Sequence, residues 1–92
     1  MSIMEDPVRT LSREATTELF QMKIRIAQTH DLRVTMKKSR RNGLYVEWIE
    51  TKNKIDGRAE LTVASSLNDK TYEVKTIYYN DDLTLRERGT NV

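Results

Sequence analysis

The first third of the chain repeats apolar side chains at the spacing of a helix. Asp6 and Pro7 precede this repeat and make a favourable helix start, because an Asp carboxylate accepts free backbone N–H groups and Pro fits the first helical position. We therefore predict a helix over residues 7–29. Six apolar residues recur at intervals of three or four and fall on one face of such a helix: Val8, Leu11, Ala15, Leu19, Met22 and Ile26.

A strand remains an alternative for residues 19–27. Phe20, Met22, Ile24 and Ile26 alternate there with polar residues, which is the period-two pattern of a half-buried strand. The helix is favoured because acidic residues lie in its first half and basic residues towards its end, as the helix dipole prefers.

A helix at this position has a second apolar stripe formed by Phe20, Ile24 and Ala27. The first stripe already supplies a face for the core, so the second needs a cover of its own. A curled sheet, a second copy of the chain or another protein would each provide one. These three residues are therefore candidates for a protein interface.

After Asp31 the pattern changes to alternation of apolar and polar residues and stays there. Turn-forming residues interrupt it at 41–43, 53–57 and 67–70, which predicts four strands joined by tight connections. A short fifth strand from Leu83 to Arg86 is an additional expectation. The predicted fold is a single α+β domain over residues 1–92, in which an N-terminal helix packs in two layers on a four- to five-stranded antiparallel meander.

Alternation also predicts which side chains face the helix. We assign Leu32, Val34 and Met36, then Leu44, Val46 and Trp48, then Ala59, Leu61 and Val63, then Tyr72, Val74, Thr76 and Tyr78 to the inner face. Trp48 is accordingly expected in the core. The outer face then carries four apolar or aromatic anchors suited to a protein interface: Tyr45, Ile49, Ile77 and Tyr79.

Positive charge is concentrated in one short segment, although the net charge is only +2. Residues 37–41 hold four cations in what the pattern predicts to be a hairpin loop, where they could neutralise phosphates. An ordinary solvated hairpin tip is the competing interpretation. The candidates for nucleic-acid contact, supported by the outer tyrosines, are Arg33, Lys37, Lys38, Arg40 and Arg41.

The residue types available narrow the chemistry. The chain has no cysteine and one histidine, so thiolate chemistry is excluded and a zinc site is not expected. We expect no cofactor and no metal. No stretch approaches the length of a membrane span, which leads us to expect no membrane partner and a cytoplasmic protein, with nuclear or viral intracellular locations also open.

Glu73 and Lys75 provide the only arrangement that suggests catalysis. A Glu-x-Lys on a strand occurs in metal-dependent nucleases, but the tripeptide is common in charged strands and an ion pair explains it equally well. We therefore expect a non-enzymatic binding or regulatory module. Its partner would be a protein or a second copy of the chain, with nucleic acid as the alternative.

Overall fold

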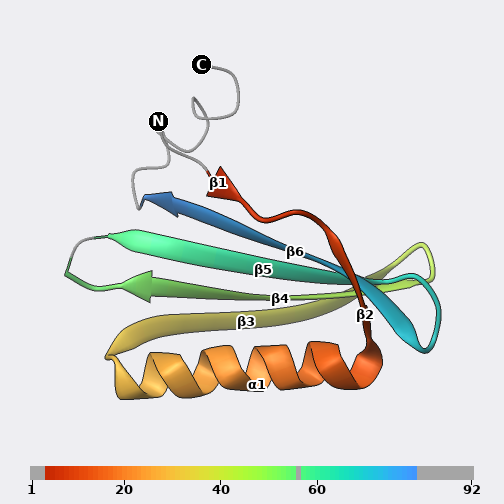
Figure 1. The fold of residues 1–92 in the computed structure, drawn as a ribbon, viewed down its shortest axis with the longest axis horizontal. Coiled ribbons are helices and arrows are strands. Elements are labelled where there is room, and N and C mark those ends of the chain that lie inside the picture. The colour runs from red at the N-terminus through yellow and green to blue at the C-terminus, as the bar shows by residue number, and fades with distance from the viewer. Residues whose placement is uncertain (1–3, 56, 81–92) are drawn as a thin grey trace.

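The computed structural model describes residues 4–55 and 57–80, which form one helix and six strands. In chain order these are β1 (Met4–Glu5), β2 (Arg9–Ser12), α1 (Arg13–Thr29), β3 (Leu32–Arg41), β4 (Leu44–Asn53), β5 (Arg58–Ser66) and β6 (Thr71–Asn80). Figure 1 shows the strands following one another from β3, beside the helix, to β6 and β1. The helix-plus-meander α+β fold predicted from the sequence is confirmed.

All strand pairs are antiparallel, in the order β1-β6-β5-β4-β3 with β2 also on β6. The helix packs against both β3 and β2, which lie at opposite edges of this sheet. The helix begins directly after β2, ends just before β3 and also contacts β4 and β6, so it crosses one face of the sheet from edge to edge. This face forms the core with the helix. The predicted fifth strand at Leu83–Arg86 lies outside the described residues.

The predicted helix start at Asp6 and Pro7 is wrong. Residues 9–12 instead form β2 on the edge of β6, and the ladder between β1 and β6 is one residue out of register with that between β2 and β6. Pro7 lies in this interruption, where its missing N–H costs no ladder hydrogen bond. The Asp6 N–H donates to the Thr76 carbonyl at 2.9 Å. Pairing with β6 therefore overrides a good local helix signal.

Ser12 is the actual N-cap of α1. Its Oγ accepts a hydrogen bond from the Ala15 N–H at 3.1 Å, and its φ of −65° and ψ of 162° are the extended backbone typical of this position. Residues 19–27 are helical, as favoured. The second stripe nevertheless supplies the buried apolar side chains of the helix, although Leu19 of the first stripe also packs against the core cluster. Phe20 and Ala27 are 3% and 1% exposed, whereas Met22 and Ile26 are each 45% exposed.

A two-residue turn at Asn42 and Gly43 joins β3 to β4. Both residues have positive φ, 54° and 80°, as a type I′ hairpin turn requires. The turn pairs Arg41 with Leu44. Because directly paired residues share a face of the sheet, residue 44 must lie on the same side as 41 and 39.

This register corrects the predicted facing of β4 and β5. If the even-numbered residues of β3 face the helix, the odd-numbered residues of β4 do too, so Ile49 faces α1 and Trp48 faces away. Pairing of Trp48 with Val63 then turns Val63 outward. For β3 and β6 the predicted facing agrees with the register. We call the side of the sheet that packs on α1 the helix face, and the opposite side the open face.

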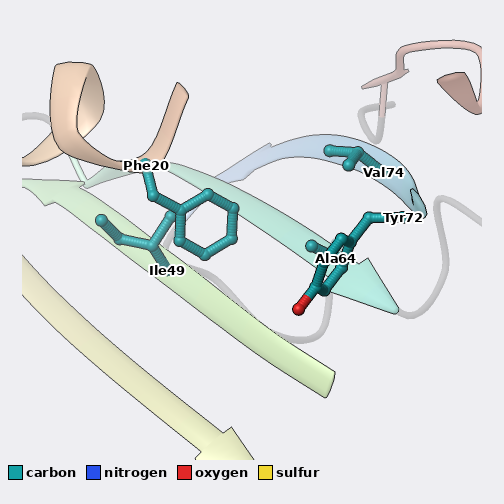
Figure 2. Close-up of a cluster of buried hydrophobic side chains, with 5 residues drawn as sticks. All are labelled: Phe20, Ile49, Ala64, Tyr72 and Val74. Carbon is teal, nitrogen blue, oxygen red and sulfur yellow. The ribbon is translucent and has the colours of Figure 1, made fainter. Parts of the chain in front are cut away.

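The core lies between α1 and the helix face. Figure 2 shows its central cluster, in which Phe20 from the helix lies over side chains from β4, β5 and β6. The remaining members of that cluster are Ile49, Ala64, Tyr72 and Val74. Two polar contacts lie on the same face: the Thr62 and Thr76 hydroxyls are hydrogen-bonded at 3.0 Å, and Lys23 on α1 forms an ion pair with Glu60 on β5.

Candidate functional site

The open face of the sheet carries a contiguous group of partly buried apolar side chains. We call it the apolar strip, and it consists of Val46, Trp48, Leu61, Val63 and Ile77. Trp48 is paired directly with Val63, and Leu61 is paired with Ile77. The members therefore lie on three adjacent strands within three neighbouring side-chain rows. The helix packs on the other side of the sheet, so it does not cover them.

Charged residues of both signs surround the apolar strip. Lys37 and Lys75 lie at the two ends of the row that contains Trp48 and Val63. Lys75 forms an ion pair with Glu5 of β1. Glu50 lies one row away, beside Leu61. This surface has an apolar centre and a polar rim, as protein interfaces do. Because the rim carries both positive and negative side chains, the surface has no electrostatic potential of a single sign.

The structure changes the role of five of the predicted interface residues. Phe20 and Ala27 are buried, and Ile24 packs partly buried against the core cluster, so the sheet of the same chain covers this stripe. Ile49 is 1% exposed, and Tyr45 packs against the core cluster from the helix face. These five residues do not form a free surface for a partner, because their side chains pack within the domain.

Two predicted interface residues do lie on the open face. Ile77 is partly buried and belongs to the apolar strip, whereas Tyr79 is only 3% exposed. Trp48, the largest side chain of the strip, is not among the interface residues predicted from the sequence. The sequence signal that identifies its position is the Asn-Gly turn. This turn fixes the pairing of β3 with β4 and so places residue 48 on the face of the sheet opposite to that of residue 36.

The cations predicted to form a hairpin loop are instead part of a strand. β3 extends to Arg41 and is an edge of the sheet, so only Asn42 and Gly43 form the turn. The cations alternate between faces: Arg33 and Lys37 lie on the open face, Lys38 and Arg40 on the helix face. They are therefore not gathered into a single patch.

Lys38 and Arg40 have neighbours on the helix face. The Lys38 Nζ lies 3.9 Å from an oxygen of Glu47, and the Arg40 guanidinium lies 5.6 Å from the centre of the Tyr45 ring. The second contact is a cation–π arrangement, which orients the guanidinium by the ring face. Arg40 is thus paired with Tyr45 at the turn end of the sheet, and Lys38 is paired with Glu47 in the next row on the same face.

Tyr78 lies on the helix face, where its hydroxyl contacts Asp6. Burial raises the pKa of Tyr78 above 10.0, and the hydrogen bond to Asp6 raises it further. The Tyr78 hydroxyl donates to Asp6 Oδ2 at 3.0 Å. The contact fastens the β1–β2 connection to β6, which is a structural role.

Glu73 and Lys75 share the open face, as their spacing implies, with Lys75 paired to Glu5. Within residues 4–55 and 57–80, three or more His, Asp or Glu side chains do not gather in an arrangement that could hold a metal ion. In the same residues, α1 is too short and too polar to cross a membrane.

Comparison of the chain with family models, with curated proteins and with solved structures found no match.

Proposed function

We propose that this protein is a non-enzymatic interaction module that binds another protein surface through its open face, and that the partner is a second copy of the chain. The observation that supports this proposal is the position of Trp48. It lies in the middle row of an apolar strip that the only described helix leaves uncovered. Central aromatic residues within an apolar patch dominate the energy of many protein interfaces.

A pleated sheet face is shaped to pack against another sheet face. Two sheets pack about 10 Å apart with interdigitating side chains, as in β-sandwiches. Both halves of such an arrangement are present when two copies meet, and the mixed charges around the strip allow opposite signs to meet across a twofold axis. A chain of 92 residues also gains stability from association, because a small domain buries little of its own surface.

Nucleic acid is the second candidate, and β3 is the observation that favours it. Arg33 and Lys37 project from this edge strand towards the open face, where Trp48 could stack on a base. Glu50 and Glu73 on the same face would repel the phosphates. This mixture of charge makes the protein interface the stronger proposal.

The cytoplasmic location is proposed on composition alone. A chain without cysteine draws no stability from disulfides, which suits a reducing compartment.

The proposal is tested by size-exclusion chromatography with light scattering on wild type, Val63→Arg and Met22→Arg. Val63 is next to Trp48, whereas Met22 is 45% exposed on the outer side of the helix, so both variants add the same charge at different surfaces. We expect wild type and Met22→Arg to be dimers at about 100 µM, and Val63→Arg to be a monomer with unchanged circular dichroism.

A wild-type protein that is monomeric at about 500 µM would contradict the proposal, as would a Val63→Arg variant that dimerises as tightly as wild type. The same samples, run with single-stranded and double-stranded oligonucleotides, separate the two candidates. The added arginine would strengthen nucleic-acid binding while it weakens self-association. Salt-sensitive co-elution that increases in Val63→Arg would favour nucleic acid.

A further inference from the structure

A cavity of about 580 Å³ lies on the helix face, at the opposite side of the sheet from the apolar strip. It is bounded by the start of α1, by the β3–β4 hairpin and by the β5–β6 connection. Its lining includes three cations, two carboxylates and two tyrosines: Arg13, Lys38, Arg40, Glu47, Asp69, Tyr45 and Tyr72. We call this cavity the helix-start cavity.

The Tyr72 side chain is the most informative part of the lining. It is only 8% exposed, and its hydroxyl has no hydrogen-bond partner among the described residues. The ring is held by an edge-to-face contact with Tyr45, with the ring centres 6.5 Å apart and the planes at 83°. The hydroxyl itself is not fully enclosed, so it can donate a hydrogen bond to water or to a ligand in the cavity.

The charges at the cavity favour an anion. Arg13 and Arg40 have no carboxylate partner within the described part of the chain, whereas Lys38 stands near Glu47. Asp69 adds a negative charge on the β5–β6 side. Three cations thus face two carboxylates, and two of those cations are guanidinium groups. Their planar forks match the geometry of carboxylate and phosphate oxygens.

We infer that the helix-start cavity binds a small organic anion through a phosphate or carboxylate group. Arg13 and Arg40 contact the anionic oxygens, and the Tyr72 hydroxyl donates to the same ligand. The edge of Tyr45 borders the rest of the molecule. This site is independent of the proposed interface, because the two lie on opposite faces of the sheet.

The inference is tested by titrating the labelled protein with inorganic phosphate and, separately, with citrate while amide chemical shifts are recorded at constant ionic strength. We expect saturable shifts at the amides of Tyr45, Ser66 and Tyr72, and none at Trp48. The stronger of the two titrations identifies the anionic group. Self-association is measured on the same samples, so failure of either proposal is seen separately.

Charge-neutral variants make the test specific. Arg13→Gln and Arg40→Gln each weaken binding by about tenfold, and Tyr72→Phe by about threefold to tenfold. Arg13 and Arg40 are exposed and the Arg13 backbone N–H, not its side chain, bonds to the Lys70 carbonyl, so these variants keep the fold. Arg33→Gln is the matched control, because it removes one positive charge from the open face.

Two results would overturn the inference. One is the absence of saturable shifts with either anion up to about 50 mM, because a specific site of this size should have a dissociation constant below that concentration. The other is an Arg33→Gln variant that loses as much affinity as Arg40→Gln, since that result would mean a diffuse attraction to net charge rather than a built site.

Discussion

Replacing Phe20 by Ala tests which side of the helix holds the domain together. Phe20 is 3% exposed and lies within the central cluster, so the change removes almost all of a large side chain from the core. Such substitutions cost about 3–5 kcal/mol, which combines lost transfer free energy with the cavity left behind. A chain of 92 residues typically has a free energy of unfolding of about 5–14 kcal/mol. The loss is therefore a large fraction of the total.

Met22→Ala is the matched control on the same helix. Met22 is 45% exposed, so only about half of its transfer free energy is at stake, and Ala is the better helix former. We expect a cost below about 1 kcal/mol. If the apolar stripe named first from the sequence faced the sheet, the order of the two variants would be reversed.

Urea unfolding followed by the fluorescence of Trp48, the only tryptophan, measures both variants. The midpoint should fall strongly for Phe20→Ala and little for Met22→Ala, with similar slopes. In thermal unfolding, the Phe20→Ala midpoint should fall by at least about 12 °C. If Phe20→Ala does not fold, Phe20→Leu provides a milder change of about 1–2 kcal/mol. Equal effects at the two positions would refute the packing described here.

Three further predictions concern individual contacts. Ser12→Ala removes the N-cap and should lower the free energy of unfolding by about 1 kcal/mol in urea titrations, whereas Ser12→Asp should preserve it; equal losses would argue against the cap. Either Thr62→Val or Thr76→Val leaves one hydroxyl buried without a partner and should cost about 1–3 kcal/mol, while the double variant should cost less than the two single losses together; additive losses in this double-mutant cycle would contradict a coupled pair. The pKa of Tyr78 is raised in the folded state, so its contribution is complete below pH 10.0 and is lost as the pH rises through the folded pKa. Stability should therefore decline in that range for wild type and less for Tyr78→Phe, and an ultraviolet phenolate titration that places this tyrosine below its usual pKa would contradict the assigned contact with Asp6.

The order of elements could be predicted because local patterns determine it. Alternation after Asp31 and turn residues at three places were sufficient for the four-stranded meander, and helical spacing was sufficient for residues 13–29. The start of the helix could not be located locally, because Asp6 and Ser12 are both good N-caps. Only the pairing of residues 9–12 with β6, a contact distant in sequence, chooses between them.

Two sequence features together determine which side of each strand faces the helix: the alternation of side chains and the turn at Asn42 and Gly43. Alternation shows that side chains alternate, but it does not say which parity faces the helix when both faces carry apolar residues. The Asn42–Gly43 turn fixes Arg41 opposite Leu44 and thereby couples the facing of β4 to that of β3. Without that coupling, Trp48 is assigned to the helix face and Ile49 to the outer face. In the fold Ile49 is buried against the helix, and Trp48 lies partly buried on the open face. The helix-start cavity depends on three separate segments and has no local signal.

The most direct test of the proposed interface is acrylamide quenching of Trp48 as a function of protein concentration. The account predicts that the quenching constant falls by at least about twofold between roughly 1 µM and 500 µM as Trp48 becomes covered by a second copy. It also predicts that Val63→Arg keeps the high value of the monomer throughout. A quenching constant that is independent of concentration in wild type would contradict the claim that the open face is where this protein binds itself.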